Sequence, residues 1–206
     1  MRRLNSAFLL HLCLFTAPLF AGEVQPVDHL IDLLDDIETL HGKFEQVGQG
    51  EPQHGVLWLA KPNQFRVESS PPLSQTIVSN GEDLWTHDRD LHQVIISELD
   101  TQAGEIPLLL FAGEAARLRE SYIVEQFTDD QHQYFVLTPV AENRVFAGFT
   151  LAFLDSLPVR LSFETTMNET TVINFYDMTV DVEDHAIFRM AVPDHVDVID
   201  DRLVSD

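Results

Sequence analysis

An amphipathic helix is predicted near the start of the chain, between Pro26 and Lys43. Apolar residues recur there three or four positions apart, which is the spacing of one helical stripe. Pro26 suits the first helical turn, and Gly42 is typical of the end of a helix. One face of this helix should therefore pack on a core. The apolar stripe consists of Val27, Leu30, Ile31, Leu34, Ile37 and Leu40, and it extends to Phe44.

From Phe44 onward the hydrophobic period changes to two, which is typical of β-strands. Turn signals separate the apolar runs. Asn80-Gly81 is the strongest hairpin signal in the chain, because both residues tolerate a positive φ. The expected strands cover residues 56–60, 65–68, 75–79, 84–85, 91–99, 122–128, 133–138, 145–154, 159–165, 171–180 and 196–199.

A second helical region interrupts the strands between Gly104 and Arg119. Pro107 begins a short apolar helix, and a more polar helix follows Gly113. About ten antiparallel strands with two short helical insertions predict an α+β chain that is mainly β, with a curved sheet or incomplete barrel. We expect the helices to lie against the concave face of that sheet.

Several strands are apolar on both faces, for example residues 145–149 and 188–192. Too few helices are expected to cover both faces of the sheet. The surplus apolar surface therefore suggests an internal cavity for a lipid-like ligand. The ordinary core of a β-sandwich is the alternative, and composition alone favours it.

The N-terminal segment is typical of a secretory signal peptide. Two arginines, Arg2 and Arg3, precede a nearly continuous apolar run from Ala7 to Phe20, and polar sequence follows Ala21. The run is short for a membrane span, so an uncleaved anchor is the less favoured interpretation. We predict cleavage after Ala21, an exported protein, and a single domain over residues 22–206.

Charge and cysteine content exclude several classes of protein. The formal net charge is −22, and loss of the two arginines of the signal peptide leaves ten basic residues against 34 acidic ones, a net charge of −24. Such a chain repels nucleic acid. Hydrophobic content of 45 % excludes intrinsic disorder. The single cysteine, Cys13, leaves with the signal peptide, so disulfides and thiol chemistry are excluded from the mature chain.

Motifs for catalysis are missing from the sequence. It contains no helix-spaced histidine pair, nucleophile elbow, phosphate loop or dinucleotide fingerprint. His87, Asp88 and His92 lie close together, but in a segment rich in turn residues where solvated polar side chains are expected. We therefore predict no catalytic residues, no metal site and no enzyme. A secreted β-rich hydrolase remains a minor alternative.

An ordered set of motifs runs through essentially the whole mature chain. The set begins with Phe44-x-Gln46, Gly55-x-Leu57-Trp58-Leu59 and Lys61-Pro62-Asn63-x-Phe65-Arg66. It continues with Pro72, Ile77-Val78-Ser79-Asn80-Gly81, Leu84-Trp85, Asp90-x-x-Gln93, Pro107-Leu108-Leu109-Leu110, Phe135-x-Leu137-Thr138-Pro139 and Phe188, and ends with Pro193-x-x-Val196-x-Val198-x-Asp200-Asp201. This ordered set resembles the periplasmic outer-membrane lipoprotein carrier family, LolA.

The resemblance implies an unclosed antiparallel β-barrel, or half-barrel, with an α-helical lid over an apolar cavity. It implies a periplasmic chaperone that accepts triacylated lipoproteins from an ATP-driven complex of the inner membrane and delivers them to an outer-membrane receptor. It implies neither catalysis nor a cofactor, and we expect a monomer. A periplasmic lipid-sensing or regulatory half-barrel domain is the alternative, although such domains usually belong to longer chains.

The resemblance also suggests which residues form the site. In the family an arginine typically ties the lid shut at the position of Lys61, and a lysine there predicts a weaker latch because it lacks the planar fork of donors. A surface lysine without this role is equally compatible with the sequence. The expected cavity wall consists of Trp58, Phe65, Trp85, Phe149 and Phe163. The expected lid consists of Leu30, Leu34 and Ile37 with Leu108, Leu109, Leu110 and Phe111.

Overall fold

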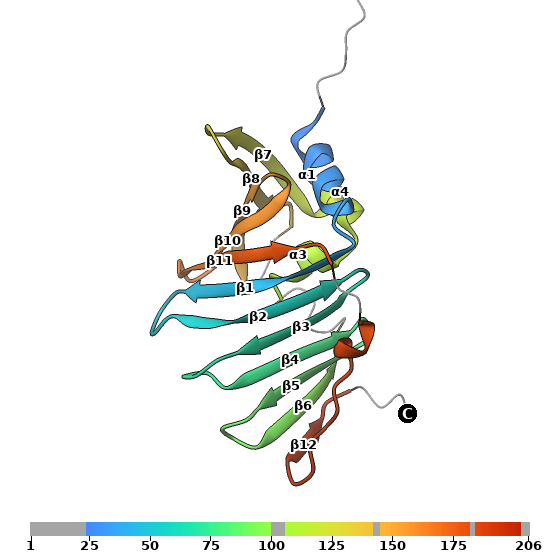
Figure 1. Ribbon diagram of the computed structural model, residues 1–206. Coiled ribbons are helices and arrows are strands. Elements are labelled where there is room, and N and C mark those ends of the chain that lie inside the picture. The colour runs from blue at the N-terminus through green and yellow to red at the C-terminus, as the bar shows by residue number, and fades with distance from the viewer. Residues whose placement is uncertain (1–23, 100–105, 142–144, 182–183, 203–206) are drawn as a thin grey trace, which may run out of the picture.

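One sheet dominates the computed structural model, which describes residues 24–99, 106–141, 145–181 and 184–202 (Figure 1). The expected signal peptide, residues 1–21, lies outside the described residues. The helices are α1 (Pro26–Asp35), α3 (Leu109–Ala112) and α4 (Leu118–Ser121), with 3₁₀ turns η2 (Ala115–Arg117) and η3 (His185–Phe188). The strands are β1 (Thr39–Val47), β2 (Gln53–Ala60), β3 (Gln64–Ser69), β4 (Gln75–Asn80), β5 (Asp83–Asp88), β6 (Gln93–Glu98), β7 (Tyr122–Thr128), β8 (Gln133–Pro139), β9 (Phe146–Leu154), β10 (Leu157–Thr165), β11 (Thr170–Thr179) and β12 (Asp197–Asp200).

The sheet is an open barrel. Its 12 strands follow the order β12-β6-β5-β4-β3-β2-β1-β11-β10-β9-β8-β7. Across the described residues the outermost strands, β7 and β12, do not pair with each other, so the barrel stays unclosed. Figure 1 shows the strands turning progressively from β7 at the top to β12 at the bottom, with α1 and α4 beside the upper strands. The mainly β, unclosed half-barrel expected from the sequence is confirmed.

Two details of the C-terminal part differ from the expectation. The last strand, β12, pairs with β6 in parallel, whereas every other neighbouring pair is antiparallel. The predicted strand at 188–192 is wrong, because η3 ends at Phe188 and residues 189–192 form no ladder. Phe188 is almost completely buried, so the apolar character of this segment reflects its contact with the sheet and not membership of it.

The predicted helix at 26–43 is only half as long in the structure, where α1 ends at Asp35 and Thr39–Val47 forms β1. Leu40 and Phe44 fit helical spacing, but they also fit the alternation of a strand, with Gly42 between them on the same buried face. Pairing with β2 on one side and β11 on the other satisfies the backbone of the whole segment. Tertiary pairing therefore overrides the helical pattern here.

Gly42 does not end a helix; it lies where β1 meets β11 at very close range. A Cβ at this position would overlap Met178 Sδ and would lie 3.0 Å from the carbonyl oxygen of Tyr176. The register between the two strands also shifts between His41 and Lys43. Glycine is therefore required for the close approach of backbones at an irregular point of the sheet.

The two faces of the sheet are packed differently. The inner face is defined here as the one toward α3 and residues 106–110, and it carries the main core. The fully buried members of this core include Leu59, Phe135, Leu137, Leu151 and Leu161. Phe65 on the same face belongs to a smaller buried cluster with Leu84 and Leu99. On the opposite, outer face of β3 and β4, η3 packs against the sheet, and Arg66 donates a hydrogen bond of 3.2 Å to the carbonyl oxygen of Ile187. The C-terminal segment therefore closes part of the outer face.

Asn80-Gly81 forms the β4–β5 turn, as expected. Gly81 has a φ of +101°, and Asn80 Oδ1 accepts hydrogen bonds from the backbone N–H groups of Glu82 and Asp83 at 2.9 and 2.8 Å. The side chain thus stabilises the turn in which it lies.

The β7–β8 turn gives a prediction for acid stability. Backbone N–H groups of Gln131 and His132, with the Tyr134 hydroxyl, lower the pKa of Asp129 to about 2. A depressed folded-state pKa contributes stability above the unfolded value of about 3.9, and that contribution is lost as the pH falls through about 2. We expect Asp129→Asn to lower the urea midpoint at about pH 6, with the difference from wild type narrowing as the pH falls from about 4 to about 2.

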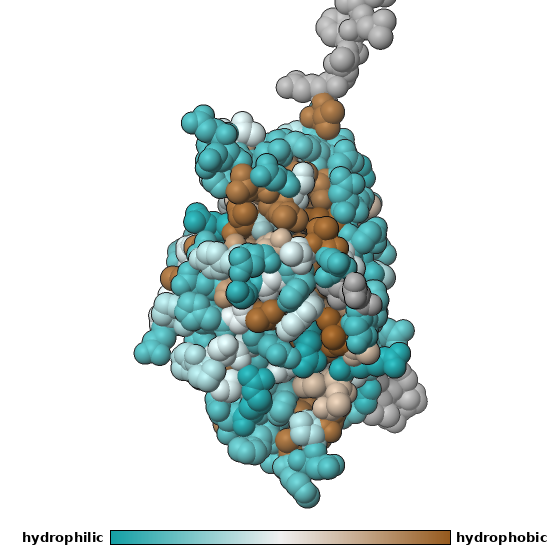
Figure 2. All heavy atoms as spheres, viewed as in Figure 1, coloured by the Kyte–Doolittle hydropathy of each residue, from teal (hydrophilic) through white to brown (hydrophobic). Residues whose placement is uncertain are grey.

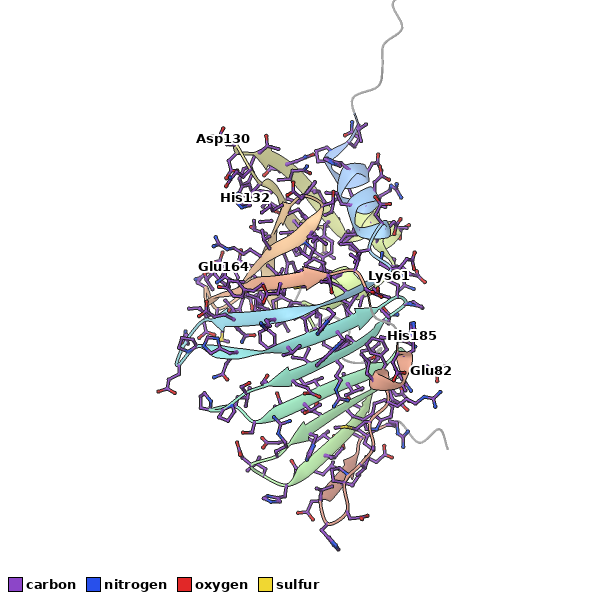
Figure 3. The ribbon with its side chains drawn as sticks, viewed as in Figure 1. Lys61, Glu82, Asp130, His132, Glu164 and His185 are labelled. Carbon is purple, nitrogen blue, oxygen red and sulfur yellow. The ribbon has the colours of Figure 1, made fainter. Side chains whose placement is uncertain are left out.

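The matched control is Asp130→Asn, at the exposed neighbouring position of the same turn (Figure 3). An Asp129→Asn difference that stays constant over the whole pH range would show that the carboxylate charge contributes nothing.

Candidate functional site

An apolar cavity of about 350 Å³ lies on the inner face of the sheet. Strands β1 to β5 and β10 to β11 form its wall, and residues 106–108 cover it. Of the described residues that line it, none carries a charge. The cavity can therefore receive an apolar group without placing it next to an ionised side chain. The apolar wall includes Phe44, Leu57, Phe65, Ile77, Phe163 and Phe175.

A second, smaller cavity of about 190 Å³ adjoins the first. It lies between the helical segment and the start of β7 and β9, and Phe149 and Tyr122 form part of its wall. Ile106 and Pro107 line both cavities. Residues 106–110 therefore divide the interior of the half-barrel, and their displacement would join the two spaces.

Three of the five residues expected in the cavity wall line a cavity. Phe65 and Phe163 line the larger one, and Phe149 lines the smaller one. Trp58 and Trp85 do not, because Leu57 and Leu84 beside them in sequence point inward and successive side chains of a strand point to opposite faces. This expectation is corrected: a one-residue error in register places a side chain on the wrong face.

The two tryptophans instead belong to the outer face. Trp58 stacks on His41, with ring centroids 5.0 Å apart and an interplanar angle of 9°. Trp85 lies opposite Val78 on one side and Ile96 on the other, and both of these residues are buried. Both tryptophans therefore pack the outer surface of the sheet.

The lid residues cover the inner face from two segments. Leu30 and Leu34 of α1 are completely buried, and Ile37 is buried just after the helix ends. Phe111 packs edge-on against Phe175, with ring centroids 5.8 Å apart. Of the remaining lid residues, Leu108 lines the larger cavity, Leu109 and Leu110 line the smaller one, and all three are partly buried.

Helix α1 also contacts α4, which follows the second lid segment in the chain. Arg119 of α4 donates a hydrogen bond of 2.8 Å to Asp28 of α1. Figure 2 shows apolar side chains gathered between α1 and the upper strands, where the helix meets the sheet. An exposed ion pair contributes about 0–1 kcal/mol to the free energy of folding. The apolar face of α1 therefore supplies most of its attachment to the sheet.

Lys61 lies where the expected latch should be. Its Nζ donates a hydrogen bond of 2.5 Å to the carbonyl oxygen of Leu34 in the last turn of α1, and lies 3.5 Å from Asp35 Oδ1. The Lys61 side chain is only 14 % exposed. In the same turn the backbone N–H of Asn63 donates to the carbonyl oxygen of Ala112, at the end of α3. The β2–β3 turn therefore holds both α1 and α3 (Figure 3).

Among the described residues, titratable side chains line the smaller cavity and not the larger one, and they include Glu114, Arg117 and Tyr122. Burial raises the pKa of Tyr122, so its hydroxyl stays neutral beside the ring of Phe149. The described residues hold no cluster of three or more metal-ligating side chains. None of the helices in the described ranges is long and apolar enough to cross a membrane.

Sequence reasoning missed the polar end of the larger cavity. Gln46, Gln53, Ser69 and Gln75 line it at the strand ends away from Lys61. The alternation of side chains along the strands could have identified these residues. Gln46 follows Phe44 by two residues and Ser69 follows Phe65 by four, so each lies on the same face as an aromatic ring that points inward.

Comparison with known proteins fits this geometry. A family model described as outer membrane lipoprotein carrier protein LolA matches residues 35–191. The chain belongs to the LolA family. The region that matches the LolA model contains the walls of both cavities and Lys61, and it begins at the last residue of α1.

Individual relatives agree with the LolA assignment. An outer-membrane lipoprotein carrier protein of Chromohalobacter salexigens is 32 % identical over 179 residues, which cover 84 % of this chain and 85 % of the relative. One from Pseudomonas paraeruginosa is 30 % identical over 206 residues, covering 97 % and 99 %. The crystal structure of an uncharacterized conserved protein from Thermus thermophilus superposes with a TM-score of 0.60 at 13 % identity, covering 85 % and 99 % of the two chains. This last likeness supports the LolA-like fold alone.

Proposed function

We propose that the protein is a periplasmic carrier of lipoproteins. It accepts triacylated lipoproteins released from the inner membrane by an ATP-driven complex, shields their acyl chains, and delivers them to an outer-membrane receptor. The observation that carries the proposal is the apolar cavity on the inner face of the sheet, which is lined by uncharged residues and covered by residues 106–108. Membership of the LolA family and the printed names of the relatives support it.

The physical need for such a carrier follows from the cargo. Each methylene exposed to water costs about 0.8 kcal/mol, so three acyl chains involve tens of kcal/mol. A triacylated protein therefore does not cross an aqueous compartment unaided. A protein with an apolar interior removes this barrier without any catalytic step or cofactor.

The observed cavity is the closed form of this proposed site. A volume of about 350 Å³ lies at the low end for a single small-molecule ligand, for which about 300–1,000 Å³ is typical. Three acyl chains need more space. We infer that residues 106–110 and α1 move away from the sheet, which joins the two cavities and enlarges the apolar interior.

The burial pattern favours a carrier over a hydrolase. Among the side chains that the structure describes, the buried polar ones are Ser69, Thr76 and Ser79, and none of them is an acid or a histidine. A hydrolase would place a paired acid and base in a cleft. In this proposal the protein acts as a monomer. Its net charge, −22 for the full chain and −24 without the predicted signal peptide, serves mainly to keep a protein with an apolar interior in solution.

Release of lipoproteins from spheroplasts tests the proposed function. The purified mature chain is incubated with energised spheroplasts, the membranes are removed by ultracentrifugation, and the supernatant is analysed for lipoproteins. We expect lipoproteins in the supernatant as stable complexes with the protein, because their acyl chains are sheltered. An equal concentration of serum albumin controls for general lipid uptake. A supernatant no richer in lipoproteins than this control would contradict the proposal.

A further inference from the structure

The end of the larger cavity away from the lid is polar but uncharged. Gln46, Gln53, Ser69 and Gln75, here termed the amide rim, come from four consecutive strands. Gln46 and Gln53 lie directly opposite each other in the β1–β2 ladder. In Figure 1 the β1–β2 hairpin lies at the left, while Figure 3 places Lys61 at the right. The cavity therefore has a lid end and a rim end.

Gln53 carries an unused acceptor at this rim. Its Oε1 is buried and has no hydrogen-bond partner among the described residues, whereas its Nε2 donates to the carbonyl oxygen of Glu51 at 3.3 Å. A buried acceptor without a partner is unfavourable, and a ligand that donates an N–H group removes that cost. The rim is therefore suited to a ligand with amide groups next to its acyl chains.

The surroundings of the rim disfavour a phosphate. Gln46 and Gln53 also line a neighbouring polar depression that contains Glu51 and Glu169. Glu169 accepts a hydrogen bond of 2.8 Å from Gln49. A phosphate brings a negative charge and only acceptor oxygens, so it meets carboxylates and a carbonyl-type oxygen here instead of cations. Amide N–H groups fit the same place without repulsion.

We propose that the amide rim binds the peptide end of the acylated N-terminus of the cargo and discriminates against phospholipids that have the same acyl chains. This inference rests on the proposed carrier function and states which lipids the carrier selects. The acyl chains enter the apolar part of the cavity, the amide-linked head stays at the rim, and the rest of the cargo protein lies outside the β1–β2 hairpin. An abundant phospholipid of the membrane is thereby prevented from filling the carrier.

Binding of two lipids to the purified mature chain tests this inference. The probes are a synthetic triacylated peptide of uncharged residues and phosphatidylglycerol with matched acyl chains, each measured by displacement of a fluorescent fatty acid. Gln53→Leu is expected to raise the dissociation constant for the triacylated peptide about tenfold, since the acceptor is lost, and to leave that for phosphatidylglycerol unchanged or lower.

Gln133→Leu is the matched control. Its Oε1 is likewise buried without a partner, but Gln133 is not among the described residues that line either cavity. Gln133→Leu should therefore change the dissociation constant of neither lipid. Gln46→Lys adds a cation to the rim and is expected to strengthen phosphatidylglycerol binding about tenfold at low salt. This second variant tests the inference even if Gln53→Leu fails to fold.

The outcomes separate the two proposals. If the wild-type protein binds neither probe, the carrier function fails. If it binds the triacylated peptide, the carrier function stands and the variants test the rim. The amide rim is not a specificity site if Gln53→Leu weakens the binding of both probes equally or of neither. The same conclusion follows if Gln46→Lys leaves phosphatidylglycerol binding unchanged.

Discussion

Ile77→Trp is expected to weaken binding of a triacylated peptide about a hundredfold. Ile77 lines the larger cavity and is only partly buried, so an indole at this position fills space that acyl chains would occupy. Displacing about four methylenes at about 0.8 kcal/mol each costs about 3 kcal/mol, which is about a hundredfold in the dissociation constant. Displacement of a fluorescent fatty acid measures the change directly.

Val136→Trp is the control for this variant. Val136 is also partly buried on a strand, but its neighbour Phe135 points into the core, so Val136 lies on the outer face. The same added volume there should leave lipid binding unchanged. Equal effects of the two substitutions, or no effect of Ile77→Trp on a correctly folded protein, would show that acyl chains bind elsewhere.

Lys61→Met is expected to loosen the lid and to lower the free energy of unfolding by about 1–3 kcal/mol. The substitution keeps the apolar stem but removes the donor to the carbonyl oxygen of Leu34, a residue with no solvent exposure. The last turn of α1 then loses its tertiary hydrogen bond. Urea unfolding measures the stability, and amide hydrogen exchange should become faster in α1 than in the strands.

Two further lysine variants sharpen this test. Lys43→Met removes an ion pair to Asp177 whose partners are 65 % and 72 % exposed, so it should change stability by well under about 1 kcal/mol. Lys61→Arg should hold α1 more tightly and slow the transfer of cargo, because a guanidinium offers a planar fork of donors. A Lys61→Arg protein that transfers cargo at the wild-type rate would contradict the idea of a weak latch.

Local patterns predicted most strands because their information lies within a few residues. Alternation and turn residues located β4, β7, β8 and β9 to within a residue or two, and Asn80-Gly81 identified its hairpin correctly. The same patterns failed for residues 36–43, where helical spacing and alternation both fit. The partner strand that decides between them, β11, lies far away in the sequence.

The candidate site was only partly predictable for a related reason. Alternation shows which residues share a face, but it does not show which face becomes the interior. The sequence therefore predicts Trp58 and Trp85 in the cavity wall, whereas Leu57 and Leu84 line it in the structure. Size and hydrophobicity favoured the tryptophans. The curvature of the sheet and the position of residues 106–110 selected the other face.

The class of architecture, the positions of most turns, a surplus of apolar residues and the family to which the chain belongs could all be predicted from the sequence. These follow from composition, short-range periodicity and an ordered set of motifs, all of which can be read locally. Three features became visible only in the folded chain: Lys61 reaches the end of α1, residues 106–110 divide the interior, and glutamines line its far end. Each of these depends on pairing between distant strands, and no local pattern encodes the register of such pairing.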